Sequence, residues 1–150
     1  MKNPKPKKLC FAILEILRQH TDADHRLNQK EIATILARDY GIEVDRKTVK
    51  RNLTSLLEMG FPIQYEETRR MYPNKDGVME ESQIQHSFYI IPEFTDQELR
   101  LLIDSLLFSK HIPYSQCEEL VEKLEGLSNR YFRSRVKHIA TMPTTGPKNT

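Results

Sequence analysis

Apolar residues recur at helical spacing over the first part of the chain. One set falls at i, i+4, i+7 and i+8 and predicts a helix over residues 7–20: Leu9, Ile13, Ile16 and Leu17. Phe11 and Leu14 are expected to widen the apolar face of this helix. The polar run "TDADHR" that follows predicts a connecting loop.

A second helix is predicted to begin at Gln29 and to end near Tyr40. Asn28 is a favourable N-cap residue, and Glu31, three positions later, completes the pattern of a capping box. Gly41 can adopt a positive φ at little cost and therefore marks the C-terminal end. The buried stripe of this helix consists of Ile32, Ile35 and Leu36.

A third helix follows after the short turn "YGIEV", with Asp45 as its N-cap and Gly60 as its stop. Its inner stripe is expected to consist of Val49, Leu53, Leu56 and Leu57. Two helices joined by a tight turn that contains glycine, after an earlier helix, have the arrangement of a helix-turn-helix.

After Gly60 the pattern becomes extended. Residues 62–67 and 86–91 read as two strands, with a basic, turn-rich stretch over 68–83 between them. The strongest turn formers in that stretch are Pro73, Asn74, Asp76 and Gly77. The two runs can therefore pair as a hairpin with a long tip, and a helix-turn-helix followed by a hairpin is a winged helix.

Helical periodicity returns over residues 93–110 and 113–127. Thr95 with Glu98 and Ser115 with Glu118 have the spacing of capping pairs. The first stripe consists of Leu99, Leu102, Ile103, Leu106 and Leu107, and the second of Leu120, Val121, Leu124 and Leu127. These apolar faces could pack against each other or against the winged helix, or could supply a dimer contact.

The predicted fold class is mainly α (α+β): a winged helix-turn-helix with a two-stranded wing, followed by a helical hairpin. We expect a DNA-binding domain over 1–92 and a helical linker or dimerisation region over 93–135. Residues 136–150 have the Thr, Pro, Gly and Asn content of a flexible linker. A linker at this position suggests the front part of a longer protein, with a further C-terminal domain.

Charge is unevenly distributed along the 150 residues, although the net charge is only +2. Residues 1–60 hold 12 Lys and Arg against 8 Asp and Glu, and residues 61–150 hold 11 against 13. This asymmetry favours a polyanion-binding N-terminal module. Cys10 and Cys117 lack paired metal-ligand spacing, and no signal peptide or uncharged apolar span is evident, so we expect a cytoplasmic protein without membrane contact.

The third helix carries cations on the side opposite its apolar stripe. At about 100° per residue, the outward positions are Lys47, Thr48, Arg51, Thr54 and Ser55, with Lys50 on the flank and Arg46 in the first turn. Arg and Lys can donate to guanine, hydroxyls can reach bases or phosphates, and the helix N-terminus favours a phosphate. We expect this face to bind DNA; the alternative is that it only solubilises an exposed helix.

Two neighbouring groups could add DNA contacts. Asn28, Gln29 and Lys30 begin the second helix, which crosses the DNA backbone in this geometry. The wing contributes Arg69, Arg70 and Lys75, which could reach a minor groove or phosphates. For both groups the alternative is ordinary surface polarity.

The stretch "LNQKEIATILARDYGIEVDRKTVKRNLTSLLEMGFPI" resembles the DeoR-type winged helix at the front of WYL-domain transcriptional regulators. In "DRKTVKRNL", Asp45 stands where that family often has Ser, and Asn52 where it often has Asp. The resemblance spans residues 8–91 and continues more loosely through the two later helices, whereas the WYL domain is not evident. It implies a dimeric regulator of double-stranded DNA whose effector ligand binds a domain outside this chain.

Other functions remain open. A winged helix can also serve protein or RNA contact, because fold does not fix function. For an enzyme the sequence offers no Gly-rich phosphate loop and no nucleophile in a recognisable setting. The histidines do not cluster at metal-ligand spacing: His20, His25, His86, His111 and His138. We therefore predict no catalytic residues, no metal and no cofactor.

Overall fold

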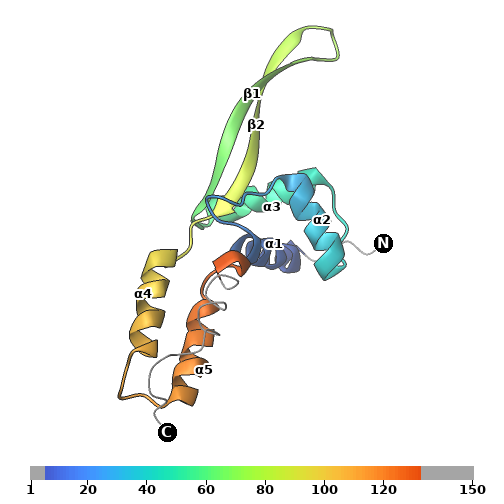
Figure 1. Ribbon diagram of the computed structural model, residues 1–150. Helices are drawn as coiled ribbons and strands as arrows, with labels where there is room; N and C mark the ends of the chain where they lie inside the picture. The colour runs from blue at the N-terminus through green and yellow to red at the C-terminus, as the bar shows by residue number, and fades with distance from the viewer. Residues whose placement is uncertain (1–5, 133–150) are drawn as a thin grey trace. The chain divides into compact units, whose positions relative to one another are not determined.

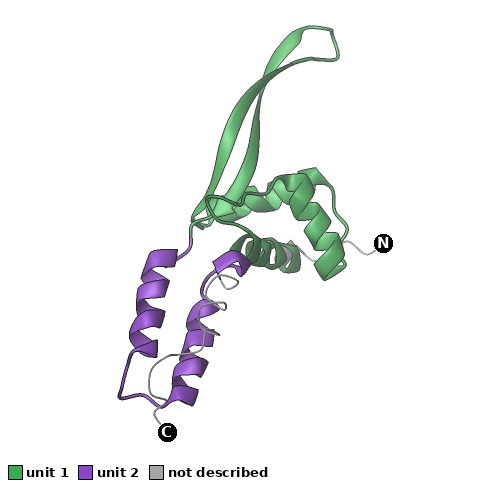
Figure 2. Ribbon diagram, in the orientation of Figure 1, with its two compact units in different colours: residues 1–91 green, residues 92–150 purple. Residues whose placement is uncertain are grey.

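The structure, a computed structural model, describes residues 6–132 and divides into two compact units (Figures 1 and 2). Unit 1 comprises Met1–Ile91 and unit 2 comprises Pro92–Thr150. This division falls within one residue of the boundary predicted after residue 92. The predicted linker over 136–150 lies outside the described residues.

The order of elements confirms the predicted fold class, mainly helical with a two-stranded antiparallel sheet. Unit 1 contains α1 (Pro6–His20), α2 (Gln29–Tyr40), α3 (Arg46–Glu58), β1 (Ile63–Pro73) and β2 (Met79–Ile90). Unit 2 contains α4 (Asp96–Leu107) and α5 (Tyr114–Glu125). A hairpin directly after a helix-turn-helix is the architecture of a winged helix.

The predicted caps set the ends of α2 and α3. The Glu31 carboxylate accepts a hydrogen bond from the Asn28 N–H (3.1 Å), and Gly41 ends α2 with φ +66°. At α3 the Asp45 carboxylate accepts from the Thr48 N–H at 2.8 Å. The two hydrogen bonds give partners to backbone N–H groups that have none within the helix. Gly41 takes the left-handed conformation with which helices commonly end.

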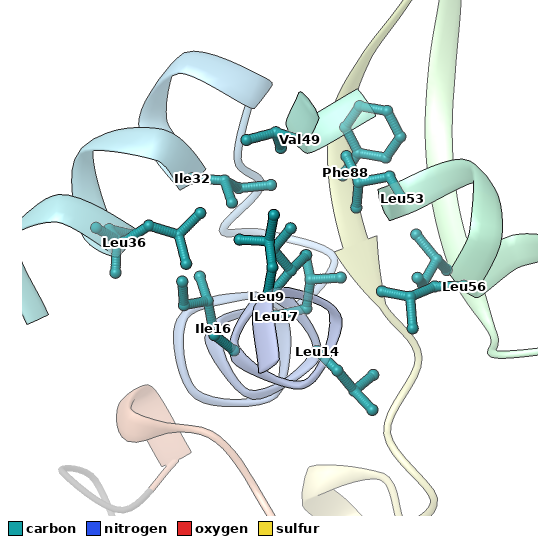
Figure 3. Packing of buried hydrophobic residues seen from close by; sticks show 14 of the residues in the cluster. Leu9, Leu14, Ile16, Leu17, Ile32, Leu36, Val49, Leu53, Leu56 and Phe88 are labelled. Atoms are coloured by element: carbon teal, nitrogen blue, oxygen red, sulfur yellow. The ribbon is translucent and has the colours of Figure 1, made fainter. Parts of the chain in front are cut away.

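The three helices of unit 1 enclose its core together with the base of the hairpin (Figure 3). The labelled side chains point into one cluster: Leu9, Leu14, Ile16, Leu17, Ile32, Leu36, Val49, Leu53, Leu56 and Phe88. The expectation for Phe11 was wrong, since this side chain is 71% exposed. Two positions correspond to about 200° of helix rotation, so Phe11 points away from the face that Leu9 buries.

The hairpin differs from the predicted short strands with a long tip over 68–83. β1 and β2 pair without further interruption from Glu66 opposite His86 to Pro73 opposite Met79, so most of that stretch is strand. The turn itself is tight, with the Asn74 side chain accepting from the N–H groups of Asp76 and Val78, each at 2.9 Å. Polar residues lie on both faces here, so no alternation of apolar and polar positions marks the strands.

Hydrogen bonds hold the base of the hairpin to the segments that follow α1. Leu27 and Phe88 exchange backbone hydrogen bonds of 2.9 and 2.8 Å. The buried Thr21 hydroxyl, just after α1, accepts from the Ile90 N–H at 3.1 Å. Further along the hairpin, the pairing of β1 with β2 shifts its register between Gln64 and Glu66. On β2, opposite this shift, Ser87 takes φ +58°.

Unit 2 has a smaller core between α4 and α5. Leu99, Ile103, Val121 and Phe132 are buried together, and Cys117 is buried on α5. Thr95 and Glu98 form the predicted capping box of α4. The predicted cap at Ser115 was wrong: α5 begins at Tyr114 with Pro113 as its N-cap residue, so Ser115 lies inside the first turn of the helix.

Part of the predicted stripes of unit 2 is exposed. Leu102, Leu107 and Leu127 each expose more than a third of their surface, whereas Leu99 and Ile103 of the first stripe are buried.

Across residues 6–132, no helix combines the length and the apolar character that a membrane crossing requires.

Candidate nucleic-acid interface

Helix α3 has one face in the core and one face in solvent. Val49, Leu53 and Leu56 are almost completely buried, which fixes the rotation of the helix about its own axis. Lys47 and Arg51, one turn apart, lie on the opposite side and are exposed. The predicted outward face is therefore present in the fold, although Thr48, also predicted to point outward, is only partly exposed.

The cations of α3 differ from Arg26 and Arg38 of unit 1 in lacking an ion-pair partner among residues 6–132. Arg46, Lys47, Lys50 and Arg51 are all exposed, and none forms an ion pair with any residue that the structure describes. By contrast, Arg26 contacts Glu66 at 3.2 Å and Arg38 contacts Asp39 at 2.9 Å. A group of unpaired cations on one helix end is suited to neutralising phosphates.

Asp45 is the acidic residue nearest to this group in the sequence, and its carboxylate is occupied by the helix. Hydrogen bonds from Thr48, and to a smaller extent attraction by Arg51 and Lys47, hold the pKa of Asp45 below its ordinary value. One of its oxygens accepts from the Thr48 N–H. Asp45 therefore stabilises the start of α3 and forms no ion pair with the lysines and arginines of this helix.

The hydroxyls further along α3 are partly committed within the helix. Thr54 donates to the Lys50 carbonyl (2.9 Å) and Ser55 to the Arg51 carbonyl (3.1 Å), so both can offer a DNA ligand only an acceptor in this arrangement. Glu58 is exposed in the last turn. Its negative charge would repel phosphates, so the surface suited to DNA is the N-terminal half of α3.

Two of the residues predicted at the start of α2 make contacts within the chain. The Asn28 side-chain oxygen accepts from the Ser87 N–H at 3.0 Å, and the Gln29 amide donates to the Gln85 carbonyl at 2.8 Å. Both bonds join α2 to β2. Lys30 is exposed and forms no ion pair within the part of the chain that the structure describes, so it keeps its charge available for a phosphate.

The wing is less basic than its arginines suggested. Residues 63–90 hold three Lys and Arg against five Asp and Glu. Arg69 is 3.4 Å from Glu81, whereas Arg70 and Lys75 are exposed and lack ion pairs among residues 6–132. The arginine pair was visible in the sequence, but the hairpin places Glu81 of β2, which stands opposite Met71, within 3.4 Å of Arg69.

The positioning residues Thr21 and Ser87 were missed by sequence reasoning. The buried Thr21 hydroxyl joins the end of α1 to β2, and the Ser87 amide binds the start of α2. Each contact joins positions more than fifty residues apart, and no local pattern marks either residue.

Comparison with protein-family models, with curated proteins and with solved structures finds no match. Within residues 6–132, no group of three or more His, Cys, Asp or Glu side chains is placed to hold a metal ion. The site is thus defined by the fold and by the exposed cations of α3 alone.

Proposed function

We propose that the protein is a sequence-specific, double-stranded-DNA-binding transcriptional regulator that inserts α3 into the major groove. The observation that carries this proposal is the set of exposed cations without ion pairs at the N-terminal half of α3. This helix is the second of a helix-turn-helix and is followed by a wing, which is the setting in which such a helix reads base edges.

The residues of the interface have different roles in this proposal. Lys47 and Arg51 lie on the outermost line of α3 and would donate to base edges, with guanine O6 and N7 as the favoured acceptors. Arg46, Lys50 and Lys30 would bind phosphates, which position the protein without selecting sequence. The N–H groups at the start of α3 favour a phosphate as well.

The internal hydrogen bonds divide the remaining candidates. Asn28 and Gln29 act mainly by holding α2 against β2, so they orient the helix-turn-helix more than they contact DNA. In the wing, Arg70 is the best-placed candidate for a phosphate contact. The acidic residues beside it argue against a wing that follows the backbone over a long distance.

Two further parts of the proposal rest on the resemblance to WYL-domain regulators. The protein would act as a homodimer, and an effector ligand would bind a domain outside these residues. A regulator of chromosomal DNA of this type would be cytoplasmic.

A duplex selected by the full chain from a randomised pool provides the test. Titrations by fluorescence anisotropy at matched salt should show that Lys47→Ala/Arg51→Ala weakens binding by roughly 30- to 20,000-fold, if each side chain makes a specific contact. If one of the two also neutralises a phosphate, the slope of log affinity against log salt should fall by about 0.9.

A matched control removes two cations outside α3. Arg100 and Lys110 of unit 2 are exposed, and the structure shows no ion pair for either among residues 6–132. Arg100→Ala/Lys110→Ala should bind the selected duplex like the parent. Equal binding by parent and the α3 double variant, or failure to enrich any duplex, would overturn the proposal.

A further inference from the structure

Strand β1 has one paired edge and one open edge. Among residues 6–132 its only strand partner is β2, whereas β2 also pairs with Leu27 through Phe88. The distal part of the hairpin extends away from the helices of unit 1 (Figure 1). Two strands alone are marginally stable in water, and an open edge offers unpaired N–H and C=O groups to another strand.

Along this edge, acidic residues precede Thr68 and basic residues follow it at the same distances. The segment reads Glu66, Glu67, Thr68, Arg69, Arg70, with two acids before the central threonine and two bases after it. If two copies of β1 run antiparallel with Thr68 opposite Thr68, Glu66 faces Arg70 and Glu67 faces Arg69 of the other copy. Every charge then meets the opposite sign, and paired residues lie on the same face of the sheet.

We propose that β1 is a self-association edge, through which two copies of this chain join their hairpins about a two-fold axis at Thr68. The product is a four-stranded antiparallel sheet. This interface would supply the dimer of the proposed function, and in that dimer Arg70 pairs with Glu66 of the other copy instead of a phosphate. The inference stands on charge complementarity and an open edge rather than on DNA binding.

The contacts inside one chain leave room for this pairing. Glu66 touches Arg26 at 3.2 Å and Arg69 touches Glu81 at 3.4 Å, while Glu67 and Arg70 have no ion pair in the part of the chain that is described. Each contact across the two-fold axis would thus join one paired and one unpaired charge. The existing ion pairs are exposed, and such pairs contribute little to stability. Glu66 and Arg69 can therefore also bind the opposite charges of the second copy.

Other modes of pairing fit the charges less well. Charged residues on an edge strand usually prevent association. A parallel pairing in register would indeed place Glu66 on Glu66 and Arg70 on Arg70. Pairing of two copies through β2 is less favourable, because that strand contains Glu80 and Glu81 but no Lys or Arg that could face them. The base of the β2 edge is also occupied by Leu27 and Gln29. The antiparallel β1 register is the one that the charges favour.

Cysteine crosslinking tests the register directly. Residues directly opposite in antiparallel strands have Cα atoms about 4.5–5.5 Å apart, within the range of a disulfide. Thr68 is exposed, so oxidation of the full-length Thr68→Cys chain should give a disulfide-linked dimer that mass spectrometry maps to residue 68 on both copies. Gln83→Cys on β2 is the control and should dimerise no more than the parent.

A charge exchange tests the complementarity without DNA. Glu67→Arg alone and Arg69→Glu alone should each raise the dimer dissociation constant, by roughly tenfold, in sedimentation velocity. Mixing the two variants places opposite charges together again and should restore a mixed dimer. Circular dichroism of each variant checks that the hairpin and helices are intact.

The results separate this inference from the proposed function. Absence of the Thr68 crosslink, or equal crosslinking of Gln83→Cys, would overturn the β1 interface whatever the protein does with DNA. A mixture that associates no better than either single variant would overturn the charge pairing. Conversely, loss of DNA binding in the α3 variant with an intact Thr68 crosslink supports both.

Discussion

The buried Thr21 hydroxyl should contribute strongly to the stability of unit 1, because its hydrogen bond joins the end of α1 to the hairpin. The O–H group donates to the Leu17 carbonyl, its oxygen accepts from the Ile90 N–H at 3.1 Å, and only 2% of the residue is exposed. Thr21→Val keeps the shape of the side chain but removes the acceptor of the Ile90 amide. That amide would then be buried without its partner.

The expected cost follows from this lost partner. An unsatisfied buried amide costs about 1–3 kcal/mol, while Leu17 keeps the hydrogen bond from the Thr21 N–H as a partner for its carbonyl. Thr21→Ser retains the hydroxyl and loses one methyl group, at a cost of about 0.8 kcal/mol. The valine variant should therefore be the less stable of the two.

Two measurements distinguish the hydroxyl from the methyl group. Urea unfolding should show a midpoint lowered by about 1 M for Thr21→Val without a change in slope. Amide hydrogen exchange should show faster exchange at Ile90 in Thr21→Val and parent-like protection in Thr21→Ser. If Thr21→Val is as stable as the parent with a protected Ile90 amide, or if only Thr21→Ser is destabilised, the reasoning is wrong.

Two other changes test backbone features near the site. Ser87 takes φ +58°, so Ser87→Val should destabilise unit 1 by about 1–2 kcal/mol, whereas Ser87→Gly should stay within about 1 kcal/mol of the parent in thermal unfolding. The pKa of Asp45 is lowered by its hydrogen bonds from Thr48, so its stabilisation is complete above the unfolded carboxyl pKa of about 3.9 and is lost as pH falls through the lower folded pKa. Asp45→Asn keeps a capping acceptor but cannot titrate, so its thermal unfolding midpoint should fall less with acid than that of the parent; an equal fall in both proteins would contradict this assignment.

The sequence predicted the helices and most of their caps because those features are local. Asn28, Asp45 and Thr95 each lie next to the helix they begin, and buried stripes such as Val49 with Leu53 need only the helical period. The outward face of α3 followed from the same period. For these elements, residues within one or two turns decide the structure.

The parts that were not predicted depend on distant residues. In the distal hairpin, where Arg70 pairs with Ser82 and Tyr72 with Glu80, neither strand alternates apolar and polar positions. Asn28 and Gln29 are chemically suited to phosphate contact, and only the fold shows that their side chains bind Ser87 and Gln85. Likewise, the ion pair between Arg69 and Glu81 joins residues twelve positions apart and depends on the pairing of the two strands.

The position of Phe88, which exchanges backbone hydrogen bonds with Leu27 and completes the core, also has a consequence for synthesis of the protein on the ribosome. The helix-turn-helix is complete in sequence at Gly60, but its core still lacks Phe88 and Ile90. A nascent chain must therefore expose the apolar surfaces of α1 and α3 until the second strand has emerged from the exit tunnel. Codons between 61 and 90 thus set how long this incompletely folded unit remains accessible to chaperones and proteases.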